Sequence, residues 1–188
     1  IAVYMYEGDT PLAERRAAAL ALDRDLLREL LGSEELRELI DPEVLADLEL
    51  ELQRLVEGRR ARDADEVHDL LRLLGPLTVE EIDIRCEGDA AALVSVLADD
   101  RRAYVASVAG EDRWAITEDA GRLRDALGVT VPVGLPAAFT DPVDDPMADL
   151  VARYARTHAP FTAASLAARY GVSVERVLPS LERLEADG

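Results

Sequence analysis

Apolar residues recur at intervals of three and four positions in two stretches of the chain. In the first they are Val67, Leu70, Leu71 and Leu74, and in the second they are Leu150, Val151, Tyr154 and Ala155. This spacing predicts two amphipathic helices that each bury one face. A Gly-Pro pair follows the first stretch and an Ala-Pro pair follows the second. Because proline disfavours helix in the residue before it, both helices should end there.

The two stretches belong to a longer internal repeat with a constant offset of 84 residues. The residues that match in register are Arg72 with Arg156, Pro76 with Pro160, Thr78 with Thr162, Arg85 with Arg169, and Leu97 with Leu181. Asp89 and Ser173 also fall in register, and both are residue types that cap helix N-termini. The repeat predicts that one three-helix unit occurs twice.

Caps and turns predict the rest of each unit. Thr78 or Thr162 caps a short second helix, and a tight turn that contains glycine leads into the third helix. Two short helices joined in this way form a helix-turn-helix. After the first copy, apolar residues alternate along a predicted strand, at Tyr104, Ala106 and Val108. A turn at residues 110–112 and a return strand with Trp114 and Ile116 complete a β-hairpin, so the unit is a winged helix.

The predicted fold class is mainly α with small β-hairpins, arranged as a helical block followed by tandem winged-helix units. The expected boundaries are 1–62 for the helical block, 63–127 for the first winged-helix unit, 128–146 for a Pro-rich connector, and 147–188 for a second unit truncated before its wing. The block should start with a strand at 1–6 and contain a helix from Asp41-Pro42 to Gly58. A helix capped by Thr117 and stopped by Gly128 should follow the hairpin.

Composition narrows the class of protein. The chain has 188 residues, nearly half of them apolar, and no run long enough to span a membrane. Its one cysteine, Cys86, excludes an intramolecular disulfide, fits a cytoplasmic location, and is expected to be a small buried residue. The net charge of −18 argues against a broad phosphate-binding surface. All 21 basic residues are arginine, the better residue for bidentate phosphate contacts.

Several strings in the chain are specific enough to suggest a family. YMYEGDTPLAERRAAALALDRDLLRELLG opens the chain, ELRELIDPEVLADLELELQ follows it, and DADEVHDLLRLLGPLT and RYARTHAPFT come later. Together they resemble the Lhr (large helicase-related) family of ATP-dependent helicases across the whole chain. The resemblance implies that residues 1–60 finish the helicase-associated domain and that the rest begins a C-terminal winged-helix array.

The resemblance also implies an activity for the parent protein. Members of the family translocate 3′ to 5′ on single-stranded DNA and unwind duplexes, with ATP and Mg²⁺ bound in motor domains that this chain does not include. Their C-terminal regions resemble winged-helix DNA glycosylases, which implies a connection with DNA repair. The glutamine pair associated with that chemistry is absent, since Gln53 is the only glutamine. Because ATP and Mg²⁺ would be bound in the motor domains, the chain itself is expected to bind no cofactor.

Possible catalytic motifs have simpler explanations. Residues 65–68 spell DEVH, which resembles a helicase DExH box, but they open an amphipathic helix and the chain has no phosphate-binding lysine. His68 and His158 have no metal ligands at suitable spacing, so no metal site is expected. The acids at 141, 144 and 145 are interpreted as a solvated loop with helix caps. The chain is therefore expected to catalyse nothing by itself.

Contact with DNA is the hypothesis that the winged helices raise. The candidate residues are Arg101, Arg102, Arg113 and Trp114 on the first hairpin, and Arg176 and Arg183 on the last helix. Trp114 either stacks a base or packs the hairpin onto the helices. The cluster of Arg59, Arg60 and Arg62 is either a solvated hinge or a phosphate contact.

Two functions remain open from the sequence. In the first, the chain is the non-catalytic winged-helix region of an Lhr-type helicase and supports non-specific nucleic-acid binding. In the second, it is a scaffold that contacts other proteins or other domains of the same chain without touching DNA. The charge of −18 favours the second, and no membrane contact is expected in either.

Overall fold

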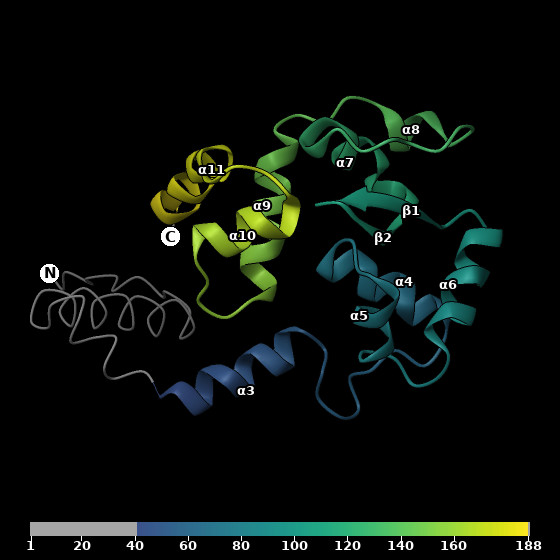
Figure 1. Cartoon of the computed structure of the whole chain (residues 1–188), viewed down its shortest axis with the longest axis horizontal. Helices are drawn as coiled ribbons and strands as arrows, with labels where there is room; N and C mark the ends of the chain where they lie inside the picture. The colour runs from purple at the N-terminus through teal and green to yellow at the C-terminus, as the bar shows by residue number, and fades with distance from the viewer. Residues whose placement is uncertain (1–40, 188) are drawn as a thin grey trace, which may run out of the picture. The chain divides into compact units, whose positions relative to one another are not determined.

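The computed structural model describes residues 41–187. The chain divides into two compact units, one that ends at Val44 and one that begins at Leu45. The strand predicted at residues 1–6 and the helices predicted before residue 41 lie outside the described residues. Figure 1 shows the elements of the second unit, which contains almost all of the described chain.

Helix α3 (Pro42–Leu52) begins where the Asp-Pro pair predicted, but it ends well before Gly58. Arg54 adopts a left-handed φ of 59°, and the N–H groups of Arg54 and Leu55 donate back into the last turn at 3.1 and 2.9 Å. This is a Schellman ending with arginine in the position that glycine usually takes. The early end places Gln53 in the interior, where Arg85 donates to its side-chain oxygen at 2.7 Å.

The first winged-helix unit forms as three helices and a hairpin. Helices α4 (Ala64–Leu74), α5 (Val79–Asp83) and α6 (Ala90–Asp99) are each capped by the residue before them, which are Asp63, Thr78 and Asp89. Strands β1 (Ala103–Val108) and β2 (Glu111–Ile116) pair in antiparallel order. The structure confirms the predicted mainly helical fold with a small β-hairpin.

The hairpin turn is shorter and earlier than predicted. Val108 pairs with Glu111, so the loop consists of Ala109 and Gly110, with positive φ values of 55° and 80°. Positive φ at both central residues is typical of a type I′ turn, whose twist matches that of the flanking strands. Leu77 extends the sheet by one bridge, since it exchanges hydrogen bonds of 3.0 and 2.7 Å with Trp114.

The segment after the hairpin packs closely on its neighbours. A 3-10 turn, η1 (Thr117–Asp119), precedes α7 (Ala120–Leu127), and Thr117 makes no side-chain cap, contrary to the prediction. Its N–H instead donates to the Arg102 carbonyl at 3.0 Å. Gly128 ends α7 in the left-handed conformation, as predicted. The Pro-rich segment contains the short helix α8 (Ala137–Thr140), and Arg124 fastens it to α7 by donating to the Thr140 carbonyl at 2.7 Å.

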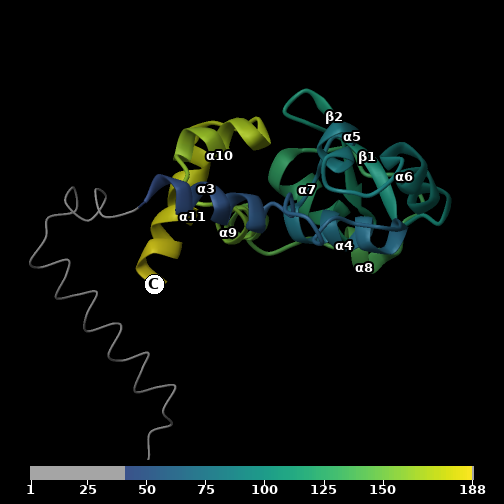
Figure 2. The same cartoon turned by 90° about the horizontal axis from the view of Figure 1, so that it is seen from below.

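Three further helices complete the compact unit that begins at Leu45: α9 (Pro146–Thr157), α10 (Ala163–Tyr170) and α11 (Val174–Asp187). Helix α10 begins 84 residues after α5, and α11 begins 84 residues after α6. Thr162 caps α10 as Thr78 caps α5. Figure 2 shows α10 and α11 on one side of the unit and α4 to α8 on the other. The elements follow the predicted repeat, whereas the predicted domain boundaries stay a prediction.

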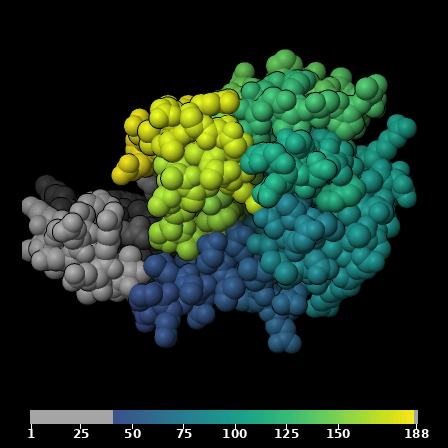
Figure 3. Space-filling model, viewed as in Figure 1, coloured from purple at the N-terminus to yellow at the C-terminus, as the bar shows by residue number. Residues whose placement is uncertain are grey.

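The hairpin contributes to two hydrophobic clusters. Ala103 and Ile116 pack with the buried residues of α4, α5 and α6. Four other hairpin residues pack with α7, α9, α10 and α11, and these are Tyr104, Ala106, Val108 and Ala115. Figure 3 shows the segment from α9 to α11, in yellow-green, directly against the teal first winged helix. One face of the wing is therefore buried against these helices, whereas residues 105, 107 and 109–112 are exposed.

A polar cluster centred on Glu81 fastens the same two groups of helices. Its Oε2 accepts from the Thr78 N–H at 2.9 Å and from Arg113 of β2 at 2.8 Å. Its Oε1 accepts from Arg169 of α10 at 2.5 Å, and Arg169 also donates to the Pro76 carbonyl at 2.8 Å. Burial would raise the pKa of Glu81, but the hydrogen bonds from Arg169 and Thr78 and the two arginine charges lower it to about 2.

Gly171, which ends α10, should be essential to the joint between hairpin and helices. It has a φ of 64°, and a Cβ added there would lie 2.7 Å from the Cα of Ala109. We expect Gly171→Ala to lower the free energy of unfolding by roughly 2–4 kcal/mol. The cost of holding alanine in a left-handed conformation would add to the cost of a clash with the backbone. Gly128→Ala is the control, since Gly128 has a φ of 73° and no atom within 4 Å. Urea denaturation should show the larger loss for Gly171→Ala, and equal losses would contradict the close contact.

Glu81 should make stability depend on acid pH. Its pKa is lowered in the folded state, so the stabilisation is complete above the unfolded pKa near 4.5 and is lost as the pH falls toward 2. We expect a loss of up to roughly 3 kcal/mol over this range. Glu81→Gln should flatten this part of the curve, and Glu80→Gln, on the exposed side of α5, should not. Unfolding by urea at pH 2.5 to 6 measures it, and parallel curves for the two variants would disprove the role of Glu81.

Candidate nucleic-acid interface

The structure gives Arg113 an internal role. Its side chain is 7% exposed and pairs with Glu81 at 2.8 Å and with Glu111 at 2.5 Å. These contacts hold β2 against α5. The sequence predicted Arg113 as a DNA contact because the hairpin of a winged helix can lie over the DNA backbone, but here its guanidinium group is buried against Glu81 and Glu111.

The other hairpin candidates are more accessible. Arg102 pairs with Asp65 at 2.5 Å, and this hydrogen bond raises the pKa of Arg102. Arg101 is exposed, with a left-handed φ of 57° at the end of α6. Trp114 is half-buried against the hydrophobic cluster of α4, α5 and α6, as the packing interpretation predicted. It also lines one groove together with Arg101.

The two candidates on α11 also have intramolecular partners. Arg176 donates to the Ala126 carbonyl at 2.7 Å and so caps the C-terminal end of α7. Arg183 pairs with Asp145, the cap of α9, at 2.5 Å. Of the six candidates, the structure brings Arg101 and Trp114 together and gives each of the others a separate intramolecular partner.

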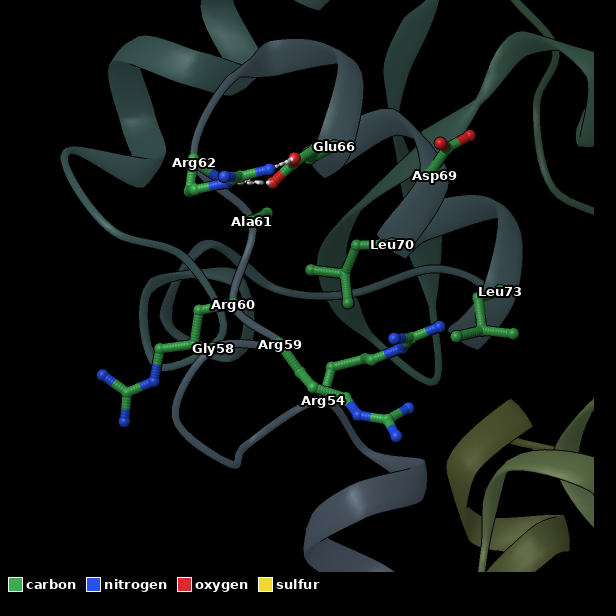
Figure 4. A pocket seen from close by; sticks show the side chains of 10 residues that line it. All are labelled: Arg54, Gly58, Arg59, Arg60, Ala61, Arg62, Glu66, Asp69, Leu70 and Leu73. Atoms are coloured by element: carbon green, nitrogen blue, oxygen red, sulfur yellow. Dashed lines mark hydrogen bonds and ion pairs between the residues drawn. The ribbon is translucent and has the colours of Figure 1, made fainter.

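A cleft of about 420 Å³ lies where α3 leads into α4, and four arginines line it. They are Arg54, Arg59, Arg60 and Arg62, which we call the arginine cleft. Figure 4 shows Arg54 and Arg59 extending toward the side on which Leu73 lies, and Arg60 extending to the other side. Leu70 and Leu73 add apolar surface, and Glu66 and Asp69 are the acids in the lining.

Local backbone structure sets the positions from which these arginines project. Arg54 occupies the left-handed position that ends α3, and Gly58 turns the chain with a φ of 77°. Ala61 then forms a parallel bridge with Cys86, with hydrogen bonds of 2.8 and 2.7 Å on its two sides. Asp63 caps α4 directly afterwards. The arginines therefore project from backbone that a helix end, a β-bridge and a helix cap hold in place.

The acids near the cleft neutralise part of its charge. Arg62 forms an ion pair with Glu66, which raises the pKa of Arg62 and lowers that of Glu66. Arg59 approaches Glu51 at 3.9 Å, with both side chains about half exposed, and such a contact is weak in water. Within residues 41–187, no ion pair involves Arg54 or Arg60. The lining carries four arginines against two acids, in a chain of net charge −18.

Comparison with known proteins places the chain in a family. Residues 38–142 match the family model described as "Large helicase-related protein, winged-helix domain". The chain belongs to the large helicase-related (Lhr) family. It is 54% identical over its whole length to a Mycolicibacterium smegmatis protein named "Lhr helicase/ probable uracil glycosylase". It is 44% identical over its whole length to an Escherichia coli protein named "Lhr helicase/uracil glycosylase".

The chain spans only 12% of the length of each of these relatives. The family model and the relatives confirm the resemblance that the sequence strings suggested. The arginine cleft lies inside the segment that the Lhr winged-helix model matches. The match describes a domain type and assigns no role to this cleft.

The cleft has the groups needed to bind an anion. Guanidinium groups donate paired hydrogen bonds that match phosphate oxygens. Within the described residues there is no group of three His, Cys, Asp or Glu side chains that could hold a metal. The DEVH string begins α4, where Asp65 and Glu66 pair with arginines and Val67 and His68 are buried. In residues 41–187, no helix is long and apolar enough to cross a membrane.

Removing Arg113 should affect folding stability. We expect Arg113→Ala to lower the free energy of unfolding by roughly 3 kcal/mol, because it leaves a buried part of the Glu81 cluster without its partner. Arg102→Ala removes an arginine whose partner Asp65 is 78% exposed, so it should change stability little. Urea denaturation of both variants measures the difference. Equal behaviour would show that the Arg113 ion pairs do not support the fold.

Proposed function

We propose that this part of the Lhr chain binds the phosphate backbone of nucleic acid without reading base sequence and without supplying catalysis. The observation that carries the proposal is the arginine cleft, a positively charged concave site in a strongly acidic chain. Affinity for nucleic acid comes largely from phosphate contacts, and Arg54 and Arg60 have guanidinium groups without competing carboxylates in the described chain.

The usual docking mode of a winged helix has less support. Helix α6, the third helix of the first unit, contains no basic residue. The hairpin is packed between two hydrophobic clusters. Arg176 on α11 is engaged with the Ala126 carbonyl. A third helix in the major groove with the wing on the backbone would therefore find few charges to meet phosphate. Arg101 and Trp114 remain as a secondary contact, in which the indole could stack a base.

The parent protein is proposed to be an ATP-dependent DNA helicase. Both relatives carry "helicase" in their names, and ATP and Mg²⁺ would act in motor domains elsewhere in the whole protein. A role in DNA repair and a cytoplasmic location fit this proposal. The other domains of the whole protein would be its partners.

Scaffolding is the second candidate function. Its support is the packing of the first hairpin against α9, α10 and α11, which shows that winged-helix surfaces in this chain are used for internal contacts. In that case the cleft would pair with an acidic surface of another domain. The two functions differ in whether the chain alone binds nucleic acid at low salt.

The test is binding of fluorescein-labelled (dT)20 to the 188-residue chain at 50 to 200 mM salt. We expect binding that weakens with salt, and Arg59→Ala/Arg60→Ala should reduce the slope of log K against log salt by about 1.4, at about 0.7 per lost contact. Arg124→Gln removes an arginine that pairs with Asp125 outside the cleft, and it should bind like the unmodified chain.

Two results would contradict the proposal. Failure of the unmodified chain to bind at 50 mM salt would favour the scaffold. Equal affinity for the cleft variant and Arg124→Gln would show that the cleft is not the binding site. Circular dichroism of each variant checks that the fold is retained.

A further inference from the structure

A second cavity, of about 620 Å³, is also lined by four arginines. They are Arg72, Arg122, Arg153 and Arg156, which we call the second arginine cavity. The described chain contains 16 arginines, and the two cavities together take eight of them. The second lining also carries four arginines against two acids, Glu118 and Asp119. A chain of charge −18 thus has two positively charged hollows.

Two of these arginines form a fixed wall. Asp119 is 2% exposed, and Arg153 binds it through two hydrogen bonds of 2.5 and 2.9 Å. Arg122 also pairs with Asp119 and reaches Asp149 at 3.0 Å. One buried carboxylate therefore holds two guanidinium groups in place. Since Asp119 is occupied by both arginines, it cannot repel an incoming anion as a free carboxylate would.

The other two arginines have no such role. Arg72 and Arg156 are exposed, and no hydrogen bond or ion pair joins either of them to another residue of the 41–187 segment. They are equivalent in the internal repeat, and each lies in the last turn of its helix, α4 or α9. A favourable interaction with the helix dipole explains a basic residue at each position. It does not explain why both line the same cavity.

Leu73 lines both hollows, so the two adjoin along α4. Helix α4 has 11 residues, which corresponds to a length of about 16 Å. Arg62 lies just before its start, and Arg72 lies in its last turn. A strand of a few nucleotides can follow a helix of this length. The arginine cleft and the second arginine cavity therefore form a row of charges with Leu73 between them.

We propose that the second arginine cavity is a phosphate subsite, and that one single strand of nucleic acid runs from the arginine cleft across Leu73 into it. The proposal rests on the proposed function, since it extends the same binding site. A flexible single strand fits because both sites are hollows of a few hundred Å³, too small for a duplex to enter. Positively charged grooves that follow the backbone are the usual means of binding single strands without sequence preference.

The experiment measures affinity and stoichiometry with labelled (dT)20 and (dT)4 at 50 and 200 mM salt. The test variant is Arg72→Ala/Arg156→Ala, which should fold normally because neither side chain has a partner in the described chain. The cleft variant is Arg59→Ala/Arg60→Ala, and Arg124→Gln is the control. We expect the test variant to bind (dT)20 at least threefold more weakly at 50 mM salt, with a slope reduced by about 1.4. Arg72→Glu/Arg156→Glu should weaken binding further.

Stoichiometry shows whether one strand occupies both hollows. We expect one (dT)20 per chain at saturation, whereas (dT)4 should bind at up to two per chain. Two (dT)20 strands per chain would overturn the continuous path. Competition with inorganic pyrophosphate tests whether the two hollows are isolated anion sites. Equal displacement of (dT)20 and (dT)4 by pyrophosphate would show two isolated anion sites and would also overturn the path.

Failure of this inference can be told apart from failure of the proposed function. If the cleft variant weakens binding and the test variant does not, the second subsite is wrong and the proposed function stands. If only the test variant weakens binding, the cleft and the continuous path are both wrong. If neither differs from Arg124→Gln, both proposals fail.

Discussion

The ion-pair cluster of Glu81 is the constraint on which the arrangement of this unit depends. One carboxylate accepts hydrogen bonds from the start of α5, from β2 and from α10. A partly buried carboxylate is stable in charged form only when enough donors surround it. Here the donors come from elements that are far apart in the sequence, so the cluster forms only when these elements meet. Gln53 and Arg85 extend the polar contacts to the end of α3.

The packing of the hairpin against the other helices limits how the winged helix can contact DNA. The hairpin shares its side chains between two hydrophobic clusters, and Arg113 neutralises Glu81. A wing with one face packed against other helices has only its outer face and its tip left for contact with DNA. The charges suited to phosphate are found instead between α3 and α4 and at the C-terminal ends of α4 and α9, where several arginines have no carboxylate partner within residues 41–187.

The distribution of arginine pairing explains how an acidic chain can keep such sites. Most of the described arginines are held by a nearby carboxylate or carbonyl, as in Arg124 with Asp125 and Arg153 with Asp119. These pairs stabilise packing and add little to the surface field. Within residues 41–187 the arginines without a partner are few, and four of them, Arg54, Arg60, Arg72 and Arg156, line two adjoining hollows. Local charge therefore differs in sign from the total charge.

The sequence by itself determined the local elements and the family. Apolar spacing, Thr78, Thr162 and the constant offset predicted the helices, because caps and periodicity act within a few residues. It placed the turn of the hairpin and the end of α3 incorrectly, since Ala109 and Arg54 adopt the left-handed conformation that glycine usually takes. Which arginines are buried, paired or gathered in a hollow was decided by the tertiary structure. A charge has its effect through its neighbours in space, and the sequence does not contain those distances.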